Sequence, residues 1–145
     1  MAFLIDTGVL LRAFDVDTPE YRRIRQTIRT LWARHERLVV ALQNVAEFWN
    51  VSTRPTSNNG YGLSAERASK RLATIERFCE VITENEHSFL AWKSLLTDYS
   101  ITGVAVHDAR LVSVMLCHGI STVVTLNDRD FRRYGGITAV TPVTV

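Results

Sequence analysis

Residues 3–10 of the chain read FLIDTGVL, an apolar run that is interrupted by Asp6, Thr7 and Gly8. The apolar run that ends at Ile5 predicts a short buried strand over residues 1–5. The apolar residues that follow recur at helical spacing, which predicts a helix over residues 7–14. Asp6 lies at the junction between the two. A strand that passes directly into a helix is typical of proteins in which strands and helices alternate.

The same alternation continues along the rest of the chain. Further apolar runs predict strands over residues 38–42 (LVVAL), 81–82, 121–126 (STVVTL) and 139–140, with helical segments between them. Because these strands are continuous apolar runs, we expect a parallel sheet that is buried on both faces. We predict a single α/β domain over residues 1–145, in which helices cover both faces of a central parallel sheet.

Local signals mark where several helices begin and end. Thr18-Pro19-Glu20 places a proline at the first position of an arginine-rich helix. Ser64 is the predicted cap of a helix that runs to about Phe78. His107 opens a further helix, and Gly119 ends it.

The triplet Asp6-Thr7-Gly8 also occurs as the catalytic element of retroviral-type aspartic proteases. Those proteins are built almost entirely of strands, and two of their Asp-Thr-Gly loops share a proton in a dimer. They also need a glycine-rich flap and a second apolar element with a glycine, which the sequence lacks. Because a helix is predicted directly after Asp6, the sequence argues against a protease.

With 145 residues, of which 46 % are hydrophobic, the chain is long enough for one compact domain. It contains no run of about 18 apolar residues, as a membrane-spanning helix would need, and it does not open with the pattern of a signal peptide. Cys79 and Cys117 stand alone, without the spacing of a zinc site. We therefore expect a cytoplasmic protein without a membrane segment, in which both cysteines are buried thiols.

Acidic residues recur where predicted strands end or where the following helices begin. Asp6 follows the first strand, and Glu47 lies about one turn into the helix after the second. Asp108 stands at the start of the helix that precedes the strand at residues 121–126, while Asp128 and Asp130 follow that strand. The carboxyl ends of parallel strands meet at one edge of a sheet, where ligands bind. We therefore expect these acids to converge.

Each acid alone has a simpler explanation, because a carboxylate in the first turn of a helix commonly caps it. Glu47 fits that explanation less well, since Ala46, Phe48 and Trp49 surround it with apolar side chains and a buried unpaired carboxylate is costly. A divalent metal site explains the joint pattern better than separate caps do. Several carboxylates without histidine or cysteine ligands suit Mg²⁺ or Mn²⁺.

Four segments together resemble the successive motifs of the PIN domain family, and more narrowly the VapC-type toxin ribonucleases of bacterial toxin–antitoxin pairs. They are FLIDTGVLL, NVAEFWNVSTRP, VHDARLVSVMLCHGI and VVTLNDRDFRRYGGITAVTP, and they follow in the right order over nearly the whole chain. The resemblance implies an endoribonuclease that uses Mg²⁺ or Mn²⁺ and cuts transfer RNA or another structured RNA. It also implies a cognate antitoxin and a homodimer.

Carried over to this sequence, the resemblance gives catalytic roles to Asp6, Glu47 and Asp108, the first three acids of the family. Metal coordination falls mainly to Asp6 and Asp108. Thr7 is the serine or threonine that usually accompanies the first acid. Water activated by the metal would attack a phosphodiester, with Glu47 as a ligand through water or as a general base.

The fourth acid is the point at which the sequence departs from the family pattern. Many members have an aspartate two residues after the threonine that ends the strand, but this sequence has Asn127 there. Asp130 is the predicted substitute, and Asp128 is the weaker alternative. An asparagine can bind a metal through its carbonyl but adds no charge, so the sequence leaves open whether one or two ions bind.

Arginine accounts for 15 of the 17 basic residues, and residues 21–37 contain six arginines against one acid, Glu36. Arginine makes forked contacts with phosphate that lysine cannot reproduce, although an exposed helix face explains this segment equally well. An acidic site needs a basic rim to attract RNA, and Arg12, Arg54 and this segment are candidates.

Two other interpretations remain open at the level of sequence. One is a non-catalytic PIN-fold module that binds nucleic acid or protein, which the missing charge at Asn127 leaves possible. The other is a DNA-directed nuclease of the same fold, because nothing in the sequence separates RNA from DNA.

Overall fold

The structure of the chain is a computed structural model that describes residues 1–143. These residues form a five-stranded sheet in the order β3-β2-β1-β4-β5, in which all neighbouring strands are parallel. This arrangement confirms the predicted parallel sheet. The strands are β1 (Ala2–Ile5), β2 (Arg37–Ala41), β3 (Glu80–Ile82), β4 (Thr122–Val124) and β5 (Thr138–Val140).

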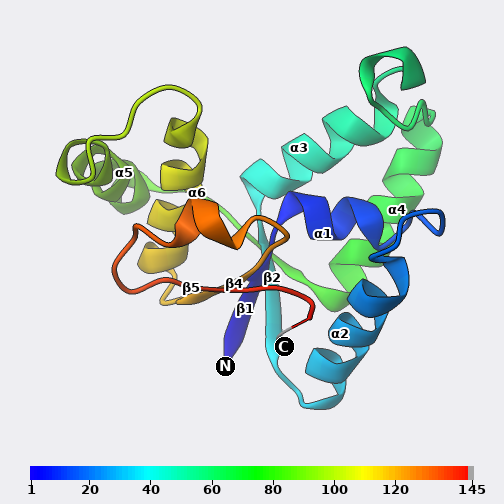
Figure 1. Ribbon diagram of the computed structural model, residues 1–145, viewed down its shortest axis with the longest axis horizontal. Coiled ribbons are helices and arrows are strands. Elements are labelled where there is room, and N and C mark those ends of the chain that lie inside the picture. Colours follow the sequence, from blue (N-terminus) through cyan, green and yellow to red (C-terminus); the bar gives the residue numbers. More distant parts are fainter. Residues whose placement is uncertain (144–145) are drawn as a thin grey trace.

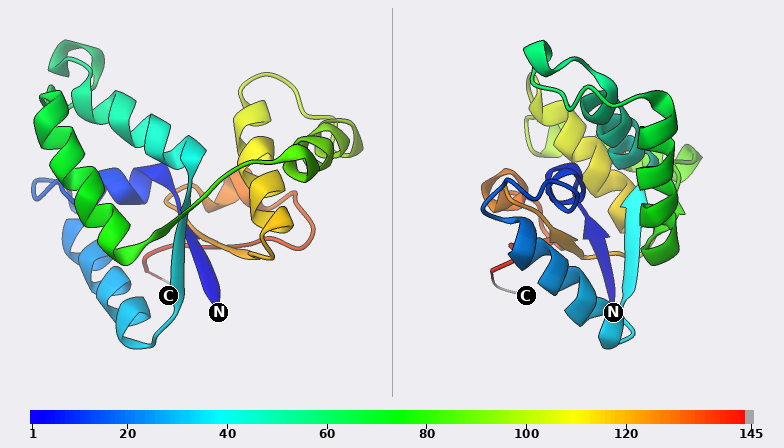
Figure 2. Two further views of the ribbon diagram at one scale, coloured as in Figure 1. Left: turned by 180° about the vertical axis from the view of Figure 1, so that it is seen from behind. Right: turned by 90° about the vertical axis from the view of Figure 1, so that its right-hand side faces the viewer.

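Helices connect the strands and cover the sheet on both faces, as predicted. Figures 1 and 2 show α5 and α6 on one side of the sheet, with α2 and α4 on the other. The α-helices are α1 (Thr7–Arg12), α2 (Tyr21–Ala33), α3 (Leu42–Thr53), α4 (Ala65–Phe78), α5 (Glu86–Asp98) and α6 (Ala105–Cys117). Two short 3-10 helices, η1 (Thr56–Asn58) and η2 (Asp128–Phe131), lie in connecting segments.

The core has two parts, one on each face of the sheet. Successive side chains of a strand point to opposite faces, so Leu4 packs into the part under α6 while its neighbour Ile5 packs into the part under α2. Val123 and Val124 divide in the same way. Strand positions that are buried on both faces of a sheet are mostly apolar, which explains the apolar runs of β1 and of β2 after Arg37.

The strand order places a topological switch point between β1 and β4. From β1 the chain moves outward through β2 and β3, and it then returns to form β4 on the other side of β1. The backbone N–H of Asp6 donates to the carbonyl of Val124 at 3.0 Å, so Asp6 extends the pairing of these two strands. Ligands of open parallel sheets bind at such a switch point, next to the carboxyl ends of the strands.

Three predicted helix ends differ from the structure. α2 begins at Tyr21 rather than Pro19, because the Thr18 hydroxyl and backbone N–H both bond the Asp15 carbonyl and hold the preceding residues in a turn. α1 ends at Arg12 and does not reach residue 14. α6 begins at Ala105, so Asp108 lies inside its first turn instead of opening the helix.

The two cysteines differ in environment. Cys79 follows α4 and is half-buried, and burial raises the pKa of its thiol to about 12. Cys117 is exposed at the last position of α6, so the prediction that both thiols are buried is wrong for Cys117. Within residues 1–143, no helix combines the length and the apolar character needed to cross a membrane.

Candidate active site

Asp6 caps α1 at the carboxyl end of β1, and both of its carboxylate oxygens are held. Oδ1 accepts the backbone N–H of Thr7 at 2.9 Å, and Oδ2 accepts the hydroxyl of Thr125 at 2.7 Å. Thr125 is fully buried just after β4, so the first and fourth strands together fix this side chain. Each oxygen retains further acceptor capacity, because an ionised carboxylate has about four lone-pair sites.

Burial raises the pKa of Asp6 above its ordinary value. The hydrogen bonds from Thr125 and Thr7 partly offset this shift, and the negative charges of Glu47 and Asp130 add to it. A nearby positive charge would therefore favour the ionised form of Asp6.

Thr7 links Asp6 to α3. Its hydroxyl donates to Glu47 Oε2 at 2.6 Å and accepts the side-chain amide of Asn44 at 3.1 Å. Asn44 is fully buried, and its Oδ1 accepts the backbone N–H of Ala41 at the end of β2. Polar side chains thus fix the start of α3 against α1, and this places Glu47 beside Asp6.

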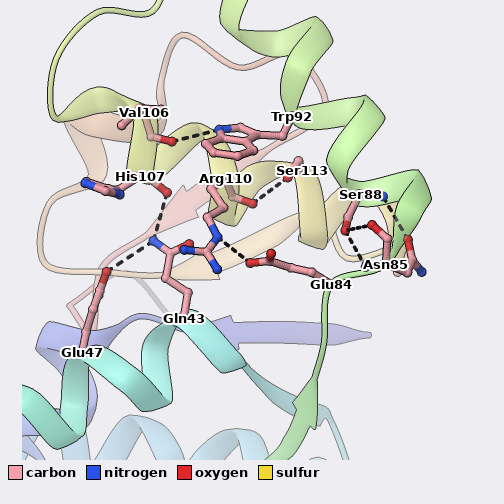
Figure 3. A network of polar contacts seen from close by, with 10 residues as sticks. All are labelled: Gln43, Glu47, Glu84, Asn85, Ser88, Trp92, Val106, His107, Arg110 and Ser113. Atoms are coloured by element: carbon pink, nitrogen blue, oxygen red, sulfur yellow. Dashed lines mark hydrogen bonds and ion pairs between the residues drawn. The ribbon is translucent and has the colours of Figure 1, made fainter.

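Gln43 completes the contacts of Glu47 and extends them to α6. Its Nε2 donates to Glu47 Oε1 at 3.3 Å and to the carbonyl of His107 at 3.0 Å, as Figure 3 shows. Both oxygens of Glu47 therefore accept a hydrogen bond. The side chain of Glu47 is half-buried and Ala46 is exposed, so the apolar enclosure expected around Glu47 is incomplete.

Asp108 and Asp130 add two further negative charges near Asp6 and Glu47. Asp108 is half-buried in α6, and its pKa rises to about 6, mainly through burial and then through the charges of Asp130, Asp6 and Glu47. Asp130 lies exposed in η2. Within residues 1–143, none of these four acids forms an ion pair. The negative charges of Asp6, Glu47, Asp108 and Asp130 therefore act on one another, whereas Asp128, which was also expected to converge with them, is paired with Arg132.

The other two candidates after β4 have different surroundings. Asp128 Oδ2 accepts Arg132 Nη2 at 2.8 Å, and this bond lowers the pKa of Asp128. Asn127 is exposed, and its backbone N–H donates to the Thr125 hydroxyl at 3.1 Å. Of the residues considered for the fourth acid, Asp130 is the one whose charge acts on Asp6 and Asp108.

The two arginines expected to contact RNA lie in different places. Arg12, the last residue of α1, reaches back to the Gly8 carbonyl at 3.4 Å and pairs with Glu20 at 3.7 Å. Arg54 lies about two helical turns beyond Glu47, and its Nη2 donates to the Asn59 carbonyl at 3.1 Å. A side chain at Gly60 would collide with the Arg54 backbone, so Arg54 is part of a tightly packed loop.

Sequence reasoning missed three residues that hold the acids, namely Gln43, Asn44 and Thr125. All three are buried polar side chains that bond an acid or Thr7. Their position directly after the apolar runs LVVAL and VV could have indicated this role, because a polar side chain that is buried there needs a hydrogen-bond partner.

The donor set suits a hard divalent cation. Within residues 1–143, no three histidine, cysteine, aspartate or glutamate side chains form a ready-made metal-binding group. Mg²⁺ does not require such a group, because it keeps several of its waters and binds through one or two carboxylates. Carboxylates that repel one another and lack a basic partner fit this mode of binding.

The raised pKa of Asp108 predicts how the stability of the ion-free protein changes with pH. Because folding raises the pKa of Asp108 from 3.8 to about 6, protonation of Asp108 stabilises the folded state. This stabilisation is complete below about pH 4 and is lost as the pH rises past 6. We expect the melting temperature of the wild type, measured in EDTA, to fall relative to that of Asp108→Asn as the pH rises over this range. Asp98→Asn, at the exposed end of α5, should keep the wild-type slope. Equal slopes in all three proteins would contradict this assignment.

Comparison with known proteins gives a family and a fold. A PIN domain family model matches residues 3–137, whereas no curated protein matches the chain. The chain is similar to the structure of VapBC2 from Rickettsia felis bound to a DNA fragment from the promoter, with 17 % identity, a TM-score of 0.73, and coverage of 97 % of this chain and 98 % of that chain.

Two further structures are similar over nearly their full length. DNA-bound VapBC from Salmonella typhimurium has 17 % identity and a TM-score of 0.71, with 98 % of each chain covered. The Mycobacterium tuberculosis toxin VapC20, which cleaves the sarcin-ricin loop, has 16 % identity and a TM-score of 0.62, with 93 % of this chain and 98 % of that chain covered. At these identities the likeness shows the fold.

Proposed function

Because the chain belongs to the PIN domain family, we propose that it is a divalent-metal-dependent endoribonuclease and the toxin of a VapBC-like toxin–antitoxin pair. One observation carries the proposal: Asp6, Glu47, Asp108 and Asp130 converge at the switch point of the sheet, and within residues 1–143 none of them has an ion-pair partner. Such a cluster is electrostatically unfavourable until a cation binds.

Asp6 and Asp108 are the proposed ligands of Mg²⁺ or Mn²⁺. Burial raises the pKa of each, and the charge of Asp6 contributes to the shift of Asp108, so a cation bound by both would stabilise the two ionised carboxylates. Thr7 and Thr125 fix the direction of the Asp6 oxygens. When bound, the ion acidifies a water and neutralises charge on the phosphate oxygens.

Glu47 is the proposed group that orients the attacking water or accepts its proton. Its two oxygens are held by Thr7 and Gln43, so the carboxylate keeps one orientation while retaining free lone pairs. Asp130 is exposed beside Asp6 and Asp108, where it can add a ligand or position a water. Arg12, whose guanidinium contacts the Gly8 carbonyl two residues after Asp6, is the proposed contact for the phosphate backbone.

The proposed partners are a structured RNA with a single-stranded target, a small antitoxin protein and a second copy of this chain. Support for the first two comes from proteins of similar fold, which include VapBC proteins, a toxin–antitoxin complex and a toxin that cleaves the sarcin-ricin loop. The second copy is proposed from the resemblance to VapC-type toxins alone.

The experiment that tests this function is an RNA cleavage assay with the purified protein. Mixed RNA and, in parallel, mixed single-stranded DNA are incubated with Mg²⁺, Mn²⁺ or EDTA. We expect RNA to be cut in either metal and to remain intact in EDTA. Cleavage of DNA alone would support the DNA-directed nuclease, and no cleavage under any condition would support the non-catalytic module.

The choice of fourth acid gives a prediction for the segment after β4. Asp130→Ala should lower the cleavage rate by roughly 10- to 100-fold, the usual cost of removing a group that supports a metal site. Asp128→Ala should have little effect, because Asp128 is paired with Arg132. Single-turnover rates of the three variants Asp130→Ala, Asp128→Ala and Asn127→Ala decide the matter. Loss of activity in Asn127→Ala, with normal activity in Asp130→Ala, would show that the fourth position is Asn127.

A further inference from the structure

Gln43 links the two helices that carry Glu47 and Asp108. It is 9 % exposed at the second position of α3, and its Nε2 bonds both Glu47 on its own helix and the His107 carbonyl on α6. Among residues 1–143, this second contact is the hydrogen bond that joins α3 to α6. Figure 3 shows the Gln43 side chain between the two helices.

The orientation of the Gln43 amide is set by its two acceptors. Its Oε1 is buried and has no hydrogen-bond partner. The opposite orientation would turn Oε1 toward a carboxylate and a carbonyl, which are both acceptors, and would therefore be repulsive. An orphaned buried carbonyl is unfavourable, so this residue contributes through the hydrogen bonds that it donates.

The two halves of the acid site come from opposite faces of the sheet. Glu47 belongs to α3, whose Phe48 packs into the core beside Ile5, whereas Asp108 belongs to α6, whose Val112 packs into the core beside Leu4. Figures 1 and 2 show the two helices extending in different directions from the sheet. A link between their first turns therefore helps to set the distance between the two acids.

We infer that Gln43 is a positioning residue for the proposed nuclease reaction. Gln43 holds Oε1 of Glu47, while Thr7 holds Oε2. Gln43 also bonds the carbonyl of His107, the residue that directly precedes Asp108. The inference rests on the proposed function, because a spacing between Glu47 and Asp108 matters only if the two acids act together.

The variant Gln43→Met tests this role while leaving the packing nearly unchanged. Methionine has a similar length and volume but donates no hydrogen bond, and it removes the orphaned carbonyl, so the variant should fold with a melting temperature close to wild type. We expect kcat to fall roughly 10- to 100-fold with KM little changed, the usual loss for an orienting group around a metal site. Gln26→Met, at the chain's other glutamine, is exposed on α2 and is the matched control.

A double-mutant cycle with Glu47→Ala separates positioning from a general structural effect. If Gln43 acts through Glu47, then adding Gln43→Met to Glu47→Ala should lower kcat no further. A structural role would lower kcat by the same factor in both backgrounds. Wild-type kcat in Gln43→Met, or equal factors in the two backgrounds, would overturn the inference.

A spectroscopic measurement keeps this test independent of activity. The side-chain amide signals of Gln43 in ¹⁵N–¹H NMR spectra can be identified by their loss in Gln43→Met. We expect these signals to shift in Glu47→Ala, while those of Gln26 stay in place. A protein that cleaves no RNA would overturn the proposed function, and the NMR result would then decide whether Gln43 holds Glu47. Unshifted Gln43 signals would show that it does not.

Discussion

Replacing Asp6 by asparagine is expected to lower the rate of RNA cleavage by more than about 100-fold, because groups one step further from a metal already contribute 10- to 100-fold. Asparagine keeps the size of the side chain and one oxygen that can accept the Thr7 backbone N–H. It removes the charge that would bind the cation. The fold should persist, and the melting temperature should not fall, since burial disfavours the ionised form of Asp6 in the ion-free protein.

The measurement is a single-turnover cleavage rate at saturating Mg²⁺ together with a thermal denaturation curve. Asp98→Asn removes a charge of the same kind from the exposed end of α5 and serves as the control. A folded Asp6→Asn protein that cuts RNA within a few-fold of the wild-type rate would show that Asp6 does not hold the ion.

Expression of the wild-type chain in bacteria is expected to stop growth, and this is the second large effect. A nuclease that cuts an essential RNA acts catalytically, so few molecules should lower the number of surviving colonies by orders of magnitude. Asp108→Asn, which removes a proposed metal ligand, should restore growth at the same protein level. Colony counts after induction, with immunoblots to compare expression, measure the effect.

The toxin proposal adds a rescue experiment. Co-expression of the antitoxin, which we would seek as a small reading frame next to the gene, should restore growth and give a complex that survives purification. Light scattering on the protein alone then reports whether it forms the proposed homodimer. A harmless monomer that does not bind the neighbouring product would contradict the toxin assignment while leaving the nuclease site to be tested separately.

The fold could be predicted because strands that are buried on both faces of a sheet have apolar residues at consecutive positions. The segment LVVAL is apolar at consecutive positions, which a strand open to water on one face would not be. Once the sheet is parallel, the carboxyl ends of its strands share one edge. The convergence of Asp6, Glu47 and Asp108 follows from that geometry together with their place in the sequence.

The residues that hold the acids could not be predicted in the same way. The bonds of Thr125 to Asp6 and of Asn44 to Thr7 join positions 119 and 37 residues apart. Such pairs depend on the register of β1 against β4 and on the angle at which α3 leaves β2, and neither is encoded in a local pattern. The same is true of Gln43, whose partner carbonyl lies on a helix from the opposite face.

Turns directly before α2 and α6 explain why the predicted first residues of these helices were wrong. Proline favours the first position of a helix, but Asp15 and Thr18 form a turn before Pro19, and the helix begins at Tyr21. Asp108 opens no helix, because a turn at Gly103, with φ of 60°, already starts α6 at Ala105. In both cases a polar or glycine turn just before the helix determined its first residue.

We claim that the converging carboxylates bind the cation with which the protein cuts RNA. The cleavage rate of one defined single-stranded RNA, measured against the concentration of free Mg²⁺, tests whether they do. We expect no cleavage in EDTA, and a rate that rises with Mg²⁺ to a plateau. Cleavage at an undiminished rate in EDTA, or RNA that stays intact at every concentration of Mg²⁺ and Mn²⁺, would contradict the claim.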